Sequence, residues 1–253
     1  MRFFSRQVTF NYILRHLRRL LFRKTVIYER RSAIAGSIVV FDCGWERVLS
    51  IGGETHSVYY KFWGWGEARR DYWGLLATPV FGNVGGANIL MLGLGGGTTL
   101  HLLYLRYFRY LRQHRPAPGH VTVVEHDPEI ISAAKKYFDL ESITRVEVIP
   151  GDAMAEMRRM RDQRVTFDML IDDVFFNMRS VDTDAGKEIY DTMKGLVRPG
   201  GSIILNRPID RPQDADRNAR FIAQLQTLGN EVALRTVRES GWNDIIYFRT
   251  REP

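Results

Sequence analysis

The chain has 253 residues, of which 45% are hydrophobic and 26% are charged, and its net charge is +7. This balance, without a low-complexity tract, predicts one main globular domain with a small addition. The single cysteine, Cys43, excludes an internal disulfide framework, a two-cysteine redox motif and a zinc site of several thiolates, and we expect no metal site.

Residues 1–24 carry the positive charge. They contain seven basic residues and no acidic one: Arg2, Arg6, Arg15, Arg18, Arg19, Arg23 and Lys24. Without these seven, the remaining 29 basic residues balance the 29 acidic ones. Because the body of the protein is formally neutral, we expect no nucleic acid partner.

The same segment predicts a basic amphipathic helix, since Phe10, Ile13, Leu14, Leu17 and Leu21 recur at helical spacing. Such a helix could lie in an anionic membrane interface, or it could pack on the protein's own body or on a second subunit. The interrupting arginines exclude a transmembrane span. We expect a cytoplasmic protein. If the helix lies in a membrane interface, the protein would contact the inner face of the membrane peripherally.

Residues 25–78 predict a small antiparallel β domain. Turn signals separate four short strands, at Thr25–Arg31, Ser37–Asp42, Arg47–Ile51 and His56–Tyr60. A short helix is expected at Tyr72–Thr78, and Pro79–Ala87 is a glycine-rich linker.

Residues 79–253 predict a doubly wound α/β domain. An apolar strand at Asn88–Leu94 runs into a glycine turn, with Gly93, Gly95 and Gly97, and then into a helix from Thr98 to Gln113. Glycines there allow a sharp turn and a close approach of the backbone to a ligand. The next strand, Val121–Glu125, ends in a carboxylate that can accept hydrogen bonds from a ribose diol.

Alternation of strands and helices continues to the end of the chain and predicts a parallel sheet covered on both faces. The expected helices are Pro128–Phe138, Ala153–Arg161, Ala185–Leu196 and Ala215–Leu228, and the expected strands are Arg145–Ile149, Phe167–Asp172, Ser202–Asn206, Glu231–Val237 and Asp244–Arg249. Ligands of such sheets lie beyond the carboxyl ends of the strands, where Glu125, Asp152 and Asp173 stand. The sequence therefore predicts one nucleoside crevice.

Taken together, these motifs resemble the spermidine synthase-like branch of the class I S-adenosylmethionine-dependent transferases. The resemblance rests on the small β domain, on Tyr72, on the glycine turn, on the Val-Glu-x-Asp strand end, on Gly-Asp at residues 151–152 and on Phe-Asp-x-x-Ile-x-Asp after residue 166. It implies a Rossmann-like, seven-stranded methyltransferase sheet with an antiparallel last strand. It also implies S-adenosylmethionine, or its decarboxylated form, as co-substrate.

Motif positions imply the site residues. The glycine turn, Gly93, Gly95, Gly96 and Gly97, would contact the sulfonium and ribose end of the co-substrate. Glu125 would bind the ribose hydroxyls and Asp152 the adenine amino group, and the next residues, His126 and Ala153, join the cofactor-binding set. Asp173 would lie at the reacting centre and act as the base, with Tyr72 orienting the acceptor. Alternatively, Glu125 and Asp152 could only cap the helices that follow them.

Three departures separate the chain from polyamine-forming members. Those usually carry Asp where this chain has Gly96 and Phe176, and Gln where it has Trp73. The missing groups would bind and deprotonate a cationic amine.

Of the two strand-end acids Asp172 and Asp173, we expect one to reach the crevice, since successive strand residues point to opposite faces. Five aromatic residues could form an apolar acceptor pocket, or could be core: Trp63, Trp65, Trp73, Phe175 and Phe176.

The predicted function is transfer of an alkyl group from a sulfonium to a nucleophile by in-line displacement. The acceptor is expected to be a small molecule, with an amine as one option, and the choice between aminopropyl and methyl transfer stays open at this point. A homodimer is common among similar proteins. The alternative is a non-catalytic module of the same fold, which the basic helix docks to a membrane or a partner.

Overall fold

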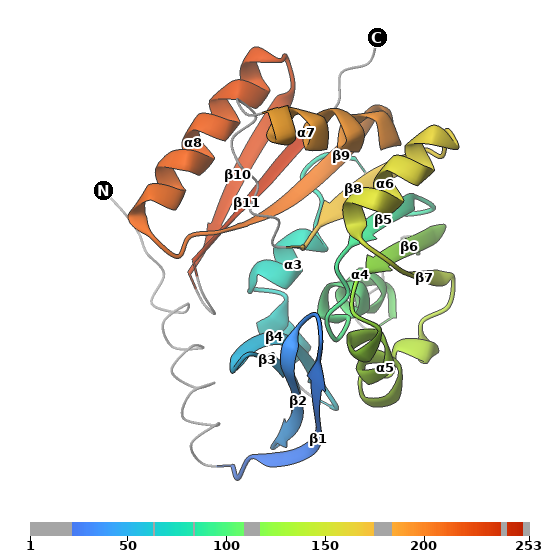
Figure 1. Ribbon diagram of the computed structural model, residues 1–253, viewed down its shortest axis with the longest axis vertical. Coiled ribbons are helices and arrows are strands. Elements are labelled where there is room, and N and C mark those ends of the chain that lie inside the picture. Colours follow the sequence, from blue (N-terminus) through green and yellow to red (C-terminus); the bar gives the residue numbers. More distant parts are fainter. Residues whose placement is uncertain are drawn as a thin grey trace.

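A computed structural model describes residues 22–62, 64–82, 84–108, 117–174, 184–238 and 242–249. Within them a small antiparallel sheet lies beside a larger α/β body, next to its helix α5 (Pro128–Tyr137) (Figure 1). The expected basic helix falls outside the described residues apart from its last three, and so do Trp63, Phe175 and Phe176. In the part of the chain that the structure describes, no helix is both long and apolar enough to cross a membrane.

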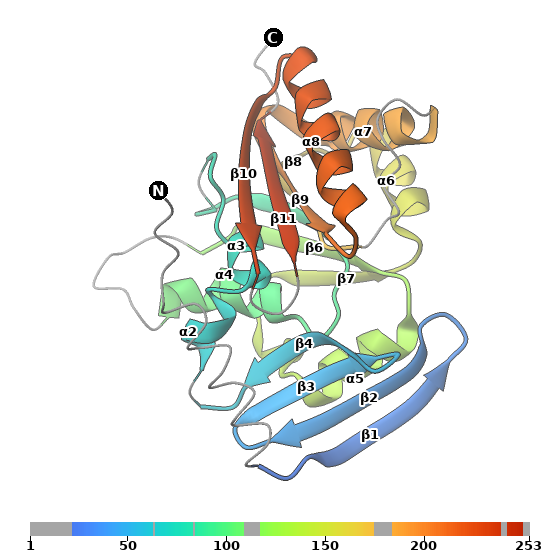
Figure 2. The ribbon, with the colours of Figure 1, turned by 90° about the vertical axis from the view of Figure 1, so that its left-hand side faces the viewer.

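The small sheet has four strands in sequence order, β1 (Thr25–Ser32), β2 (Gly36–Cys43), β3 (Glu46–Ile51) and β4 (Glu54–Tyr60). Tight hairpins join them, and glycines with positive φ at Gly44 and Gly52 allow the turns. One face packs Ile38, Val40 and Leu49 against α5 of the larger body. Figure 2 shows this sheet beneath the main body, with α5 behind it. The expected small β sheet is thus present.

The larger sheet has seven strands in the order β10-β11-β9-β8-β5-β6-β7. Their bounds are β5 (Asn88–Leu92), β6 (His120–Glu125), β7 (Val146–Pro150), β8 (Phe167–Asp172), β9 (Val197–Pro208), β10 (Glu231–Val237) and β11 (Asn243–Arg249). The last strand is antiparallel to both its neighbours, β9 and β10, which confirms the predicted methyltransferase-like sheet. The order runs outward from β5 in both directions, so a topological switch point lies between β5 and β8.

Helices cover both faces of this sheet. Their bounds are α2 (Trp65–Ala68), α3 (Tyr72–Leu76), α4 (Thr98–Phe108), α6 (Ala153–Asp162), α7 (Asp184–Leu196) and α8 (Pro212–Thr227), with a 3-10 turn η1 (Leu140–Ser142). One apolar core lies between the sheet, α3 and α4, and a second lies under α6, α7 and α8. The structure adds α2 and η1, which were not predicted.

The fifth parallel strand differs from its prediction. It was expected at Ser202–Asn206, but β9 already begins at Val197. Residues 198–201, with the sequence Arg-Pro-Gly-Gly, coincide with a register shift against β8 inside the strand, with Gly200 at φ 75°. A glycine turn can bend a strand without ending it, which is the physical reason for the difference.

Asp127 joins the two sheets. Its Oδ1 accepts a hydrogen bond from the backbone N–H of Glu129 and caps α5, where Pro128 occupies the first turn. Its Oδ2 accepts from the Ser32 hydroxyl and from the N–H of Ala35, in the hairpin between β1 and β2. Because Asp127 is 1% exposed, these bonds hold the small sheet close to the carboxyl end of β6.

Candidate active site

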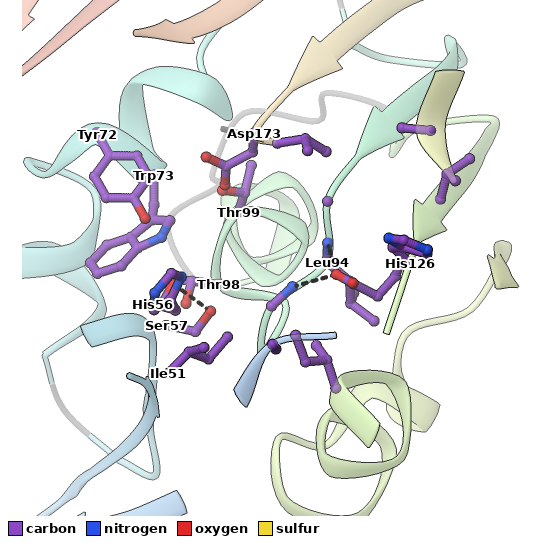
Figure 3. Close-up of a pocket in the computed structure, with 18 of the residues that line it drawn as sticks. Ile51, His56, Ser57, Tyr72, Trp73, Leu94, Thr98, Thr99, His126 and Asp173 are labelled. Carbon is purple, nitrogen blue, oxygen red and sulfur yellow. Dashed lines mark hydrogen bonds between the residues drawn. The ribbon is translucent and has the colours of Figure 1, made fainter. Parts of the chain in front are cut away.

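A cavity of about 270 Å³ lies at the carboxyl ends of β5, β6 and β8, between the larger sheet and the small sheet. Its walls come from both sheets and from the first turns of four helices, α3, α4, α5 and α6: Ala35, Ile51, His56, Ser57, Tyr72, Trp73, Gly93, Leu94, Gly95, Thr98, Thr99, Val124, Glu125, His126, Ile130, Asp152, Ala153, Asp173 and Val174. Figure 3 shows Tyr72 and Trp73 on one wall, Asp173 and Thr99 beside them, and His126 across the cavity. The structure thus brings eight of the predicted site residues together.

The glycine turn needs its glycines for two reasons. Gly93 and Gly95 have φ of 86° and 53°, and a Cβ at Gly95 would lie 2.6 Å from the Ser57 hydroxyl. Gly96 and Gly97 do not line the cavity, although the motif placed them in the binding set. A Cβ at Gly96 would instead point at Phe138 and at Ser57, 2.9 and 3.0 Å away.

Glu125 is 8% exposed and holds the turn from the tip of β6. Its Oε2 accepts from the backbone N–H of Leu94 at 3.0 Å and its Oε1 from that of Asp127 at 3.0 Å. The two oxygens offer about four lone pairs in total, so capacity remains for a ligand hydroxyl. The cap of α5, which was the alternative role for Glu125, belongs to Asp127.

Asp152 both caps a helix and faces the cavity. Its Oδ1 accepts from the N–H of Ala155 at 2.9 Å and caps α6, and the same residue lines the cavity. Ala153 and His126 also line the cavity. The capping bond uses one carboxylate oxygen and leaves the other for a donor such as an adenine amino group.

The two acids after β8 separate as strand geometry predicts. Asp173 lines the cavity, and its Oδ1 accepts from Nδ2 of Asn206 at 2.8 Å. Asp172 does not line it and accepts from the N–H of Val174 at 3.1 Å. Among the described residues, no group of three His, Cys, Asp or Glu side chains is placed to hold a metal.

Burial sets the protonation of both acids. It raises the pKa of Asp173 to about 7, against the opposing effect of the Asn206 hydrogen bond. Burial also raises the pKa of Asp172, to about 8. The hydrogen bond from the Val174 N–H and the charge of Arg207 lower the pKa of Asp172, whereas the charge of Asp173 raises it further. A carboxyl with a pKa of about 7 can both take up and release a proton near neutrality.

Tyr72 and Trp73 form the aromatic wall. Their ring centroids are 4.5 Å apart, and Asp71 caps α3 by accepting from the N–H of Tyr72. Trp65 does not line the cavity; it contacts His101, with ring centroids 5.4 Å apart. Of the five aromatic residues considered for an acceptor pocket, the described structure thus brings Trp73 to the cavity and Trp65 to the core.

The small sheet supplies residues that the sequence did not indicate. The Ser57 hydroxyl accepts from the N–H of Gly96 at 2.7 Å, and Oγ1 of Thr98 exchanges hydrogen bonds with both backbone groups of Val58. His56 also lines the cavity, where burial lowers its pKa. These contacts depend on the packing of β4 against the glycine turn. No local pattern in the sequence predicts that packing.

Thr99 was missed as well, although it directly follows the glycine turn. It is 1% exposed, lines the cavity, and its Oγ1 has no hydrogen-bond partner among the described residues. An unsatisfied buried hydroxyl is costly, so its partner is expected to be a ligand.

Comparison with known proteins assigns the family. The model of the spermine/spermidine synthase domain matches residues 28–232, which run from β1 to the start of β10. The chain belongs to the spermine/spermidine synthase domain family. This membership places it among the S-adenosylmethionine-dependent transferases of the spermidine synthase or methyltransferase type.

Relatives of this family member include methyltransferases. An eEF1A lysine and N-terminal methyltransferase homolog of Drosophila pseudoobscura pseudoobscura is 28% identical over 170 residues, which cover 63% of this chain and 23% of that protein. A homolog with the same description from Drosophila melanogaster is 29% identical over 129 residues, 47% of this chain and 17% of that protein. The chain thus spans less than a quarter of the curated relatives that it matches.

Solved structures share the fold of this family member. A probable spermidine synthase from Corynebacterium glutamicum superposes with a TM-score of 0.62 at 18% identity, covering 89% of this chain and 79% of that one. An O-methyltransferase from Bacillus cereus, solved in complex with SAH, gives a TM-score of 0.51 at 18% identity and covers 75% and 83%. At these identities the likeness concerns the fold.

Proposed function

We propose that the chain transfers a methyl group from S-adenosylmethionine to an amine, with Asp173 as the proton acceptor. The observation that carries the proposal is the buried Asp173 carboxyl, which shares one cavity with Glu125, Asp152 and the glycine turn. In this proposal the ribose lies at Glu125 and the adenine at Asp152. The orphaned Thr99 hydroxyl and the backbone of Gly93 and Gly95 fit a ligand that enters between β5 and β8.

The co-substrate supplies an activated leaving group, so the protein's own task is positioning and proton transfer. A nitrogen–carbon bond forms while the carbon–sulfur bond breaks, and the electron pair of that bond stays on sulfur. The proton of the amine passes to the Asp173 carboxylate, whose pKa of about 7 suits this exchange. Tyr72 stands on the neighbouring wall and can orient the amine through its hydroxyl.

Two observations favour methyl transfer from intact S-adenosylmethionine. The curated relatives are described as methyltransferases. In addition, Phe138 and Ser57 fill the space that a side chain at Gly96 would need, so the chain has neither that family carboxylate nor room for it without repacking. The second candidate is aminopropyl transfer from the decarboxylated form, and the match to the spermine/spermidine synthase domain favours it.

Calorimetric titration with both forms of the co-substrate tests the proposal, followed by mass spectrometry of products formed from putrescine and from a lysine-containing peptide. We expect tighter binding of intact S-adenosylmethionine and a product heavier by one methyl group. Preference for the decarboxylated form with an aminopropylated product would establish the second candidate. Binding of neither form would reject a transferase function and favour the non-catalytic alternative.

A further inference from the structure

Two buried amides stand behind Asp173 on the neighbouring strands. Asn206, near the carboxyl end of β9, donates from Nδ2 to Oδ1 of Asp173 over 2.8 Å, and Asn243, the first residue of β11, donates from Nδ2 to Oδ1 of Asn206 over 2.8 Å. The two asparagines are 4% and 6% exposed. Water therefore competes little with these bonds, and a low local dielectric strengthens them.

The two bonds form a chain in which each amide donates toward Asp173. An ionised carboxylate only accepts hydrogen bonds, so Asn206 must turn its NH2 group toward Asp173 and its carbonyl oxygen toward Asn243. Asn243 must then donate. A hydrogen bond donated by Asn206 to the carboxyl favours the ionised form of Asp173.

Other charged groups near Asp173 do not replace this contact. Asp172, the last residue of β8, precedes it, and the charge of Asp173 helps to raise the pKa of Asp172. Arg207 interacts with Asp172, and its Nε donates to Asn218 on α8. From the remaining elements around the cavity, β4 contributes His56, β6 contributes Glu125 with His126, α3 contributes Tyr72 and α6 contributes Asp152. The amide of Asn206 is the contact that opposes the effect of burial on Asp173.

We propose that Asn206 and Asn243 are positioning residues, which together keep Asp173 ionised and hold its second oxygen, Oδ2, toward the acceptor. The inference rests on the proposed role of Asp173 as proton acceptor. Asn206 acts on the carboxylate directly, and Asn243 acts through Asn206 by preventing rotation of its amide. Neither asparagine gives up a proton in the reaction.

Titration of the aspartate carboxyl carbons by NMR tests the inference on the ligand-free protein labelled with 13C at aspartate. Asp173→Asn identifies the resonance. We expect Asn206→Leu and Asn243→Leu each to raise the pKa of Asp173 by about one pH unit, because a hydrogen bond to the charged form is lost. Asn230→Leu is the matched control: this asparagine is also buried and hydrogen-bonded, but to Tyr190 and Leu225, and should leave the titration unchanged.

Asn243→Asp keeps the side-chain shape and serves if the leucine variants do not fold. Its carboxylate would turn the NH2 group of Asn206 away from Asp173 and add a negative charge, so it too should raise the pKa. An unchanged titration of Asp173 in the Asn243 variants would overturn the role of Asn243, and an unchanged titration in Asn206→Leu would overturn the whole inference. Failure of the proposed function is a separate result, since it appears as absent binding of S-adenosylmethionine by the wild-type protein.

Discussion

Replacing Asp173 by Asn should inactivate the protein and stabilise it at the same time. The amide keeps the oxygen that accepts from Asn206 but has no charge to desolvate. Burial raises the pKa of Asp173 from 3.8 to about 7. The unfolded chain therefore loses this proton near pH 4 and the folded chain near pH 7, so the carboxylate destabilises the folded state increasingly between these values.

The magnitude follows from the same values. Each pKa unit corresponds to about 1.4 kcal/mol, so a rise of about three units costs the wild-type protein up to about 4 kcal/mol above pH 7 and nothing below about pH 4. Urea denaturation of the ligand-free wild type and of Asp173→Asn at pH values from 4 to 8 measures the difference. The gain in free energy of unfolding should grow with pH across this range. A difference that does not vary with pH would refute a buried, proton-binding Asp173.

Substitutions at three further positions test two residues that line the cavity, Ser57 and Thr99, and one residue of the glycine turn beside it, Gly96. Ser57→Ala removes the acceptor for the Gly96 N–H, and the loss of about 1 to 2 kcal/mol should weaken S-adenosylmethionine binding about 5- to 30-fold in calorimetry; unchanged affinity would show that β4 does not hold the turn. Thr99→Val removes an unsatisfied hydroxyl, so the free energy of unfolding of the ligand-free protein, measured in urea, should rise by about 1 kcal/mol. The affinity for S-adenosylmethionine should fall about tenfold in Thr99→Val and stay unchanged in Thr99→Ser. Equal affinity of the wild type and both variants would contradict this role. Gly96→Asp introduces the carboxylate that polyamine-forming members carry, and its side chain would clash with Phe138. The variant should lose about 1 to 3 kcal/mol of stability and should not turn over putrescine. Turnover of putrescine would show that the missing acid alone decides the acceptor.

The sequence predicted the sheet and the strand-end acids because both depend on local patterns. Apolar runs ending at Glu125 and Asp173 mark parallel strands, and their carboxyl ends meet at one edge by topology. Alternation along β8 predicted that one of Asp172 and Asp173 reaches the cavity, and the motif position assigned Asp173, which the structure places there. The role of each acid in binding stays a prediction, as does the division of the chain at residue 79.

The remaining part of the site depends on packing between distant segments. Ser57 meets the glycine turn only because β4 docks there, and Ser57 and Gly96 are 39 positions apart in the sequence. Asn243 reaches Asn206 because the antiparallel β11 lies between β10 and β9. Asn243 belongs to no sequence motif that would have predicted this contact. Such contacts follow from the register of strands far apart in sequence, which hydrophobic periodicity does not specify.

Crystallography of the protein soaked with S-adenosylhomocysteine tests the central claim most directly. We predict density in the cavity between β5 and β8, with the ribose at Glu125, the adenine at Asp152 and the sulfur facing Asp173. A cavity that stays empty at saturating ligand, or a nucleoside bound elsewhere on the molecule, would contradict the account.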